Sequence, residues 1–430
     1  MDILVIGGGG REHAIIRKIL ESPLCGKVYC APGNGGIAAD AECVPSVKPT
    51  DIEGAVALAK EKKVDFAIVA PDDPLVLGMV DALEAAGIPA FGPHKNAAII
   101  EGSKAFAKDL MKKYGIPTAA YEVFTDAEDA IAYVKEQNTY PTVIKADGLA
   151  LGKGVLIAEN EADAVAAIRD MLEGGKFGAS GRRIVIEQFL SGPEVSVLAL
   201  TDGKVVRPLC SSMDHKRALD GDEGLNTGGM GTIAPNPAYT DEVAKKAMER
   251  IFLPTIRAMN AEGRTFQGCL YFGLMIVDGD PYVIEYNCRF GDPETQVVLP
   301  MMEGDLLAAM IATQKGALSD AVFSTRSGAA ACVVMASGGY PVKYETGKEI
   351  QGLTPDGQIP DGSATVYHAG TKRENGAYFT AGGRVLGVTA RGDTLNEALT
   401  RAYRAVKGIH FDGEHYRRDI GRKAGGTYGD

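Results

Sequence analysis

The chain has 430 residues, which allows two to four domains at roughly 150 residues each. Asp and Glu outnumber Lys and Arg by 56 to 45, and the net charge of −11 makes nucleic acid and anionic lipid poor partners. No apolar run reaches the roughly 18 residues of a membrane-spanning helix. The first residues lack a signal peptide, and the seven scattered cysteines indicate free thiols, so we expect a cytoplasmic protein.

Glycine is the unusual component of the chain. The sequence contains 54 glycines, about one residue in eight, against a typical share of roughly 7%. They follow no collagen period and no Gly/Ser linker accompanies them. The position of these glycines is therefore the first clue to function.

The first hundred residues alternate short apolar runs with helical patterns. Asp51 opens one helical pattern, and a further helix is expected over 75–86. This alternation predicts a parallel, doubly wound α/β sheet over residues 1–100. Its strands are expected at 2–6, 27–31, 64–69 and 88–91.

The next segment, residues 101–325, combines strands and helices in an α+β pattern. Helices are expected at 103–114, 162–173 and 241–261, and Asp278-Gly279-Asp280 is a hairpin signal between two strands. Residues 326–430 predict a small mixed domain with a helix at 394–407, for which Asp393 is available as N-cap. The remaining strands of the middle segment are expected at 141–146, 155–159, 183–187, 194–201, 269–277 and 282–288.

The first glycine loop, Gly7 to Gly10, lies between a strand and a helix, where backbone N–H groups can bind phosphate. The dinucleotide fingerprint fails, because Glu12 or His13 stands where its third glycine belongs and no acidic residue ends the second strand. An NAD-dependent oxidoreductase is therefore disfavoured. A mononucleotide-like phosphate site and a tight structural turn both remain open.

The second loop, residues 145–154, runs between two strands and carries a lysine at each end of its glycines. It is not a Walker A sequence, because its spacing is GxxxGK and no Ser or Thr follows. A glycine turn flanked by Lys145 and Lys153 can still fold over a triphosphate. The alternative is a flexible hairpin with solvated lysines.

Residues 283–290 form the most informative strand. Alternation predicts that Ile284, Tyr286, Cys288 and Phe290 share an apolar face, while Glu285, Asn287 and Arg289 share the other. A carboxylate and an amide oxygen two residues apart suit Mg²⁺ held jointly with substrate phosphates. A solvated strand face is the alternative.

A third glycine loop, residues 226–231, follows the polar stretch Asp214 to Arg217. It could bind an anionic substrate through its amides and basic side chains, or it could be a mobile surface loop. His215 is more often a hydrogen-bonding residue than a catalytic base.

Taken together, these loops resemble the phosphoribosylamine–glycine ligases of purine biosynthesis, a family with the ATP-grasp fold. The resemblance covers essentially the whole chain in order. It is carried by GGGGREHA (7–14), APGNGG (31–36), EGSKAF (101–106), KADGLALGKGV (145–155), DHKR (214–217), NTGGMG (226–231), EYNCRFGDPETQ (285–296), HAGTK (368–372) and TAGGRVLGVTA (380–390).

The resemblance implies a reaction of ATP, glycine and 5-phosphoribosylamine through a glycyl phosphate, giving ADP, phosphate and glycinamide ribonucleotide. It also implies an ATP-grasp core at 101–325 with a small lid subdomain at about 120–190, and a cytoplasmic monomer or homodimer. The ATP site would comprise Lys104, Lys145, Gly148, Gly152, Lys153, Gly154, Glu187, Phe189, Leu190 and Glu194.

The same resemblance implies the remaining site residues. Glu285 and Asn287 would bind Mg²⁺ or Mn²⁺, and Arg289, Lys145 and Asp214 would be catalytic. Glycine and phosphoribosylamine would meet Gly9, Arg11, Glu12, Asn34, Asp214, His215, Lys216, Asn226, Thr227, Gly228, Gly229, Met230 and Arg289.

The sequence departs from the family pattern at one position and differs from many other ATP-grasp enzymes at another, and two alternative functions stay open. Asp72 stands where the family usually has Glu, and the stretch from Tyr271 to Leu274 lacks the further acidic metal ligand of many ATP-grasp enzymes. A carboxylase of the same fold would share the ATP machinery and differ in its acceptor. A non-catalytic nucleotide-binding regulator is the other alternative.

Overall fold

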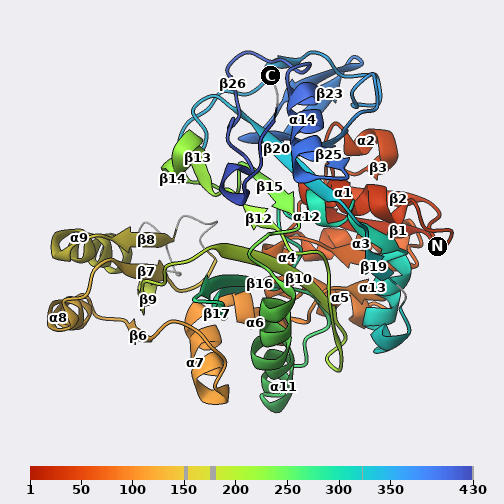
Figure 1. The fold of residues 1–430 in the computed structure, drawn as a ribbon. Coiled ribbons are helices and arrows are strands. Elements are labelled where there is room, and N and C mark those ends of the chain that lie inside the picture. Colours follow the sequence, from red (N-terminus) through yellow and green to blue (C-terminus); the bar gives the residue numbers. More distant parts are fainter. Residues whose placement is uncertain (150–153, 175–180, 322, 429–430) are drawn as a thin grey trace.

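The computed structural model describes residues 1–149, 154–174, 181–321 and 323–428 (Figure 1). Within these ranges, no helix is both long and apolar enough to cross a membrane. Gly152 and Lys153 of the second glycine loop lie outside the described residues.

The N-terminal sheet has five parallel strands in the order β3-β2-β1-β4-β5. Every residue of β1 is buried, with Leu4 and Ile6 in one hydrophobic core and Ile3 and Val5 in another. Apolar cover on both faces is typical of a doubly wound sheet, so the predicted architecture is confirmed. The strands are β1 (Ile3–Gly7), β2 (Val28–Pro32), β3 (Glu42–Cys43), β4 (Phe66–Val69) and β5 (Ala90–Phe91).

The helices of this part follow their sequence signals with one exception. The Asp51 side chain accepts from the Gly54 N–H and caps its helix as expected. The single helix predicted over 75–86 is instead two helices, because Gly78 takes a left-handed conformation with φ of +97° that ends the first. The helices are α1 (Gly10–Ile19), α2 (Ile37–Asp40), α3 (Ile52–Glu61), α4 (Asp72–Leu77), α5 (Met79–Ala85) and α6 (Lys95–Gly102).

The middle of the molecule is an antiparallel sheet in the order β11-β10-β16-β17. Its buried residues join both cores of the N-terminal sheet, so these two parts share one interior. The helical segment predicted over 241–261 contains a π turn. The elements are α7 (Lys104–Tyr114), β10 (Glu194–Thr201), β11 (Val206–Pro208), α10 (Asp241–Ala247), η3 (Met248–Phe252), α11 (Leu253–Ala261), β16 (Gly268–Val277) and β17 (Asp280–Asn287).

The pairing of β16 with β17 shifts register between Gly273 and Leu274, which leaves Ile284 as an extra residue. Val283 is therefore buried and Ile284 half-buried, so the predicted placement of Ile284 on the apolar face is wrong. Tyr286, Cys288 and Phe290 are buried as expected.

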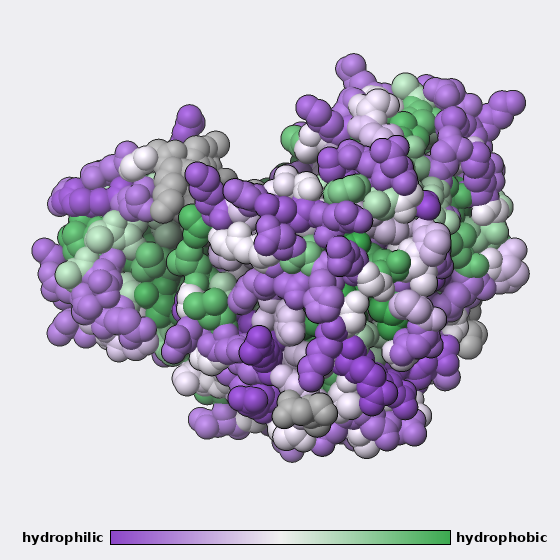
Figure 2. Space-filling view, turned by 90° about the horizontal axis from the view of Figure 1, so that it is seen from above, coloured by the Kyte–Doolittle hydropathy of each residue, from purple (hydrophilic) through white to green (hydrophobic). Residues whose placement is uncertain are grey.

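A four-stranded antiparallel sheet, in the order β6-β9-β7-β8, forms with two helices a side lobe that has its own small core. Figure 2 shows this side lobe projecting from the main body. Its elements are β6 (Tyr121–Phe124), α8 (Ala127–Gln137), β7 (Thr142–Ala146), β8 (Val155–Ala158), α9 (Glu161–Leu172) and β9 (Ile184–Gln188).

The C-terminal part is built on a sheet in the order β12-β15-β20-β25-β22, with β26 pairing β20. The strands β12 (Met213–Asp214) and β15 (Gly231–Ala234) come from the middle segment, so the third glycine loop is anchored in this sheet. Thr394, and not the predicted Asp393, caps the last helix. The other elements are β20 (Ala329–Ser337), β22 (Thr365–His368), β25 (Arg384–Gly392), α14 (Leu395–Val406) and β26 (Glu414–His415).

Smaller elements connect these parts. Three of them form a separate antiparallel sheet, β21-β24-β23, and two pairs form short ladders, β13 with β14 and β18 with β19. They are β13 (Arg217–Leu219), η2 (Asp220–Asp222), β14 (Glu223–Asn226), α12 (Thr295–Val298), β18 (Met302–Gly304), α13 (Leu306–Gln314), η4 (Leu318–Asp320), β19 (Phe323–Thr325), β21 (Glu349–Ile350), β23 (Thr371–Glu374), β24 (Ala377–Thr380) and η5 (Arg422–Ala424).

Candidate active site

The C-terminal end of β17 carries the predicted metal-binding pair. Glu285 and Asn287 are both half-buried. The Lys216 Nζ lies 3.4 Å from the Glu285 Oε1. This ammonium group, followed by Lys145 and Lys104, outweighs desolvation and lowers the pKa of Glu285 to about 2. Glu285 is therefore a carboxylate at any physiological pH and is surrounded by cations.

Two lysines and one buried carboxylate lie beside this strand. The Lys104 Nζ donates to the Gly148 carbonyl at 2.7 Å, which joins α7 to the second glycine loop. The Lys145 Nζ lies 3.0 Å from a Glu187 carboxylate oxygen and donates to the Ile284 carbonyl at 3.1 Å. The bulge at Ile284 thus supplies the carbonyl that anchors Lys145. Two of the predicted phosphate-binding lysines are brought to one place.

Arg289 is held by two side chains. Its Nη2 lies 3.1 Å from the Glu101 Oε1 and donates to the Asn287 Oδ1, also at 3.1 Å. Burial lowers the pKa of Arg289, but the carboxylates of Glu101 and Asp72 raise it by more. The guanidinium is therefore permanently charged and fixed in direction, as recognition of a phosphoryl or carboxylate group requires.

The segment after β17 is held between the N-terminal and C-terminal parts. Arg11 Nη1 donates to the Phe290 carbonyl at 3.2 Å. Arg384, at the start of β25, donates to the carbonyls of Gly228 at 2.8 Å and Asp292 at 2.9 Å. One arginine from each end of the chain therefore brings the first and third glycine loops to the strand that carries Glu285.

The third loop also needs glycine for a close approach. A Cβ on Gly229, whose φ is +116°, would lie 2.6 Å from the Asp214 Oδ1. Asp214 is half-buried against this loop, and desolvation together with the nearby Glu294 carboxylate raises its pKa well above the usual value. Such a carboxyl is a stronger base than an ordinary aspartate.

Comparison with known proteins decides the family. Models of the phosphoribosylglycinamide synthetase N domain, ATP-grasp (A) domain and C domain match residues 1–101, 102–295 and 330–423. The chain is 49% identical over 427 residues to the phosphoribosylamine–glycine ligase of Salmonella typhimurium and 50% identical over 427 residues to that of Escherichia coli, and each alignment covers 99% of both chains. The chain belongs to the phosphoribosylamine–glycine ligase family.

Solved structures agree with this assignment. The crystal structure of phosphoribosylamine–glycine ligase from Thermotoga maritima matches with a TM-score of 0.85 and 35% identity, covering 98% of this chain and 100% of that one. The biotin carboxylase domain of Hydrogenobacter thermophilus 2-oxoglutarate carboxylase matches with a TM-score of 0.72 at 19% identity, covering 96% and 91%. The second likeness shows a shared fold. The resemblance seen in the sequence is confirmed, and the chain is an ATP-grasp ligase.

Several predicted substrate residues of this phosphoribosylamine–glycine ligase family member have their polar groups bonded within the protein. The Asn34 amide donates to the carbonyls of Gly8 and His368 and accepts from two backbone N–H groups. Glu12 accepts from the Gly9 N–H at 2.6 Å and from Arg11 Nε at 2.6 Å. Met230 is fully buried, and its backbone groups bond to His215 and Val334. These residues shape the loops that a substrate would meet.

The other predicted residues are distributed around the same site. Gly154 accepts from the Ala146 N–H beside the second loop. Phe189 is 36% exposed just past β9, and Leu190 is half-buried beside it. Glu194 lies 4.0 Å from Lys216 at the start of β10. Thr227 accepts from the Gly229 N–H and donates to the Lys216 carbonyl, and Asn226 pairs with Arg217 at the base of the loop.

Four residues at the site had no individual role in the sequence interpretation. Glu101 holds Arg289, and Lys108 lies 2.9 Å from Glu187. Arg384 and Asp292 form an ion pair at 3.5 Å between the C-terminal part and the segment after β17. Three of the four lie inside quoted motifs, so the motifs indicated them, but only the tertiary contacts assign their partners.

Buried neutral histidines predict a loss of stability in acid. His13, His215 and His368 are at most 3% exposed. Burial is the main cause that lowers the pKa of all three, to about 4 for His215 and about 3 for His368. The unfolded chain protonates these rings below about pH 6.5, and the folded chain does so only in stronger acid. The contribution of these neutral imidazoles to the free energy of unfolding is therefore fully present above pH 6.5 and is lost as the pH falls toward 4.

We expect the free energy of unfolding to fall between pH 7 and pH 5 by about 2 kcal/mol for each of His215 and His368. Urea unfolding at pH 7, 6 and 5 measures this slope. His215→Gln should flatten the slope, whereas the control His410→Gln, at a side chain that is 62% exposed, should not. A slope equally steep in both variants would contradict the assignment to His215.

Proposed function

We propose that this chain joins glycine to 5-phosphoribosylamine at the expense of ATP, giving glycinamide ribonucleotide, ADP and phosphate in purine biosynthesis. The observation that carries the proposal is the convergence of all three described loop regions on the end of β17. The first and third loops are tied to residues 290–292 by Arg11 and Arg384, and the second is tied to β17 by Lys145, which donates to the Ile284 carbonyl. These contacts can therefore bring a nucleotide, an amino acid and a phosphorylated amine together at one site.

The first step forms a glycyl phosphate. A glycine carboxylate oxygen attacks the γ-phosphorus of ATP, a new O–P bond forms, and the bond to the β-phosphate bridging oxygen breaks to release ADP. Lys104 and Lys145 bind the phosphates, and Arg289 neutralises the charge that passes through the transferred group. Catalysis then depends on positioning and electrostatics, as in other phosphoryl transfers.

The second step forms the amide. The amine of phosphoribosylamine attacks the acyl carbon, and the C–O bond to phosphate breaks. Asp214 is suited to accept the proton that the amine loses, because its raised pKa makes it a better base than an exposed aspartate. The Gly228–Gly229 loop packs against Asp214 and would orient the acceptor.

The residues at the end of β17 fit a divalent cation, Mg²⁺ or Mn²⁺. Glu285 is ionised, and Asn287, whose amide oxygen also accepts from Arg289, lies two residues further on the same face. Among the described residues, no group of three or more His, Cys, Asp or Glu side chains is placed to hold a metal. A cation there would complete its shell with phosphate oxygens and water, and when bound it would neutralise phosphate charge.

We also propose the domain division 1–100, 101–325 and 326–430, with the side lobe as the lid at about 120–190. The separate core of the side lobe supports the lid, and the core of the C-terminal sheet, to which β15 adds Ile233, supports a third unit. The enzyme is proposed to be a cytoplasmic monomer or homodimer.

The test is an assay of ADP release with ATP, 5-phosphoribosylamine and either glycine or bicarbonate. We expect turnover only with glycine. Turnover with bicarbonate and none with glycine would support a carboxylase of the same fold and overturn the proposal. No turnover with either acceptor, from protein that still binds ATP, would support a non-catalytic regulator.

A further inference from the structure

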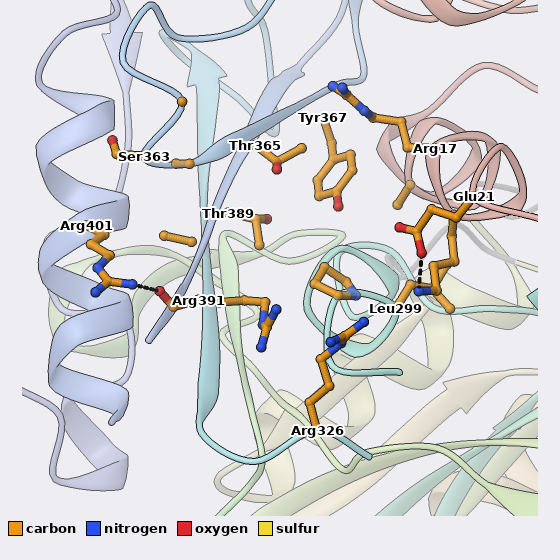
Figure 3. A pocket seen from close by; sticks show the side chains of 16 residues that line it. Arg17, Glu21, Leu299, Arg326, Ser363, Thr365, Tyr367, Thr389, Arg391 and Arg401 are labelled. Atoms are coloured by element: carbon orange, nitrogen blue, oxygen red, sulfur yellow. Dashed lines mark hydrogen bonds and ion pairs between the residues drawn. The ribbon is translucent and has the colours of Figure 1, made fainter. Parts of the chain in front are cut away.

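A cavity lies away from the proposed active site, where three parts of the chain meet. Its volume is about 360 Å³. Figure 3 shows α1 on one side, the C-terminal strands and α14 on the other, and Leu299 from the middle segment beside the cavity. Ligand pockets in proteins start at roughly 300 Å³, so a small molecule fits.

The lining of this cavity is strongly basic, although the chain as a whole is acidic. Five cationic side chains line it: Arg17, Lys18, Arg326, Arg391 and Arg401. The only acidic side chain among its lining residues is Glu21, which lies 2.6 Å from Lys18 and neutralises it. Outside the lining, a Glu303 carboxylate oxygen lies 3.4 Å from Arg326 and a Glu397 carboxylate oxygen lies 3.9 Å from Arg401.

Two of these arginines have few hydrogen-bond or ion-pair partners within the protein. The Arg17 Nη1 is buried and has no hydrogen-bond partner, and its Nε is 3.7 Å from Asp40. Among the described residues, no ion pair involves Arg391, whose carbonyl accepts from Arg401 at 2.8 Å. A buried guanidinium N–H without an acceptor costs free energy, so an anionic oxygen in the cavity would relieve that cost.

The cavity is distinct from the active site. Arg11 and Lys18 are seven residues apart on α1, a rise of about 10 Å. Arg384 and Arg391 are seven residues apart on β25, roughly 23 Å along a strand. The cavity therefore lies at the opposite end of the same helix and the same strand that hold the active-site loops.

We propose that this cavity binds a small, multiply charged phosphate ester, up to about the size of a nucleoside phosphate. Planar guanidinium groups suit phosphate because they donate two parallel hydrogen bonds to its oxygens. The Tyr367 hydroxyl also points into the space in Figure 3 and can donate to the ligand. A ligand here joins the N-terminal and C-terminal parts, so it should raise the melting temperature.

The test uses inorganic pyrophosphate as the probe, with isothermal titration and thermal melting. The variant combines Arg391→Gln with Arg401→Gln, two exposed side chains. The matched control combines Arg250→Gln with Arg257→Gln, exposed arginines of η3 and α11 that remove the same charge. Lys104→Gln separates this cavity from the proposed ATP site.

We expect the cavity variant to bind pyrophosphate at least about tenfold more weakly and to lose the rise in melting temperature. The control pair and Lys104→Gln should retain both. If the cavity variant fails to fold, Arg326→Gln repeats the test with one change at a side chain that is 35% exposed. Affinity unchanged in the cavity variant, or lost only in Lys104→Gln, would overturn the proposal.

Discussion

Glu285→Ala is expected to lower glycine-dependent ADP formation by a factor of about 10² to 10³. The substitution removes the carboxylate on which Lys216, Lys145 and Lys104 converge, and with it a proposed cation ligand. The loss should appear in kcat, because the missing group acts on the phosphates as they react. The measurement is steady-state ADP release at saturating substrates.

The fold should survive this change, since the Glu285 side chain is about one-third exposed and supports no hydrophobic core. Glu242→Ala is the matched control, at a side chain that is 78% exposed on α10. Both variants should melt close to the unchanged protein. If the activity of Glu285→Ala lay within threefold of the control, the assignment of Glu285 to the active site would be wrong.

Arg289→Lys is the second substitution with a large expected effect, a decrease in kcat of about 10²-fold. Lysine keeps the positive charge but loses the fork that contacts Glu101, Asn287 and a substrate oxygen together. The buried Glu101 would also lose its partner, so some loss of stability should accompany the loss of activity. ADP release and urea unfolding measured on the same protein separate the two effects.

Arg250→Lys provides the comparison for this substitution. Arg250 contacts Asp280 at 2.9 Å on the surface. The same exchange there should leave kcat and the free energy of unfolding nearly unchanged. An Arg289→Lys enzyme that retained full kcat would show that charge alone is needed at this position.

Local periodicity was enough to predict most of the architecture. The strand expected at 194–201 has those bounds, and the parallel sheet of the first hundred residues follows from alternating apolar runs and helices. Errors arose where one residue changes a pattern. Gly78 divides a helix that its apolar spacing predicts to be continuous, and the extra residue at Ile284 moves Val283 to the apolar face.

The site was predictable to the level of loops but not of individual contacts. Glycine density and flanking lysines identify segments that can meet phosphate. They do not reveal that the Asn34 amide is fully used inside the protein, or that Arg384 reaches Gly228 from 156 residues away. Such long-range partners depend on how the sheets pack against each other, which no local spacing encodes.

The side lobe has a consequence for how the enzyme can move. Its core is separate, and within the described part of the chain a small cluster of Ala105, Tyr121 and Val185 links it to α7 by buried apolar contact. Lys145 belongs to this lobe and Lys104 to the main body. A rigid-body swing of the lobe would therefore break few apolar contacts yet change the spacing of the two lysines. A triphosphate that contacts both lysines would stabilise the position of the side lobe in which Lys104 and Lys145 lie close together.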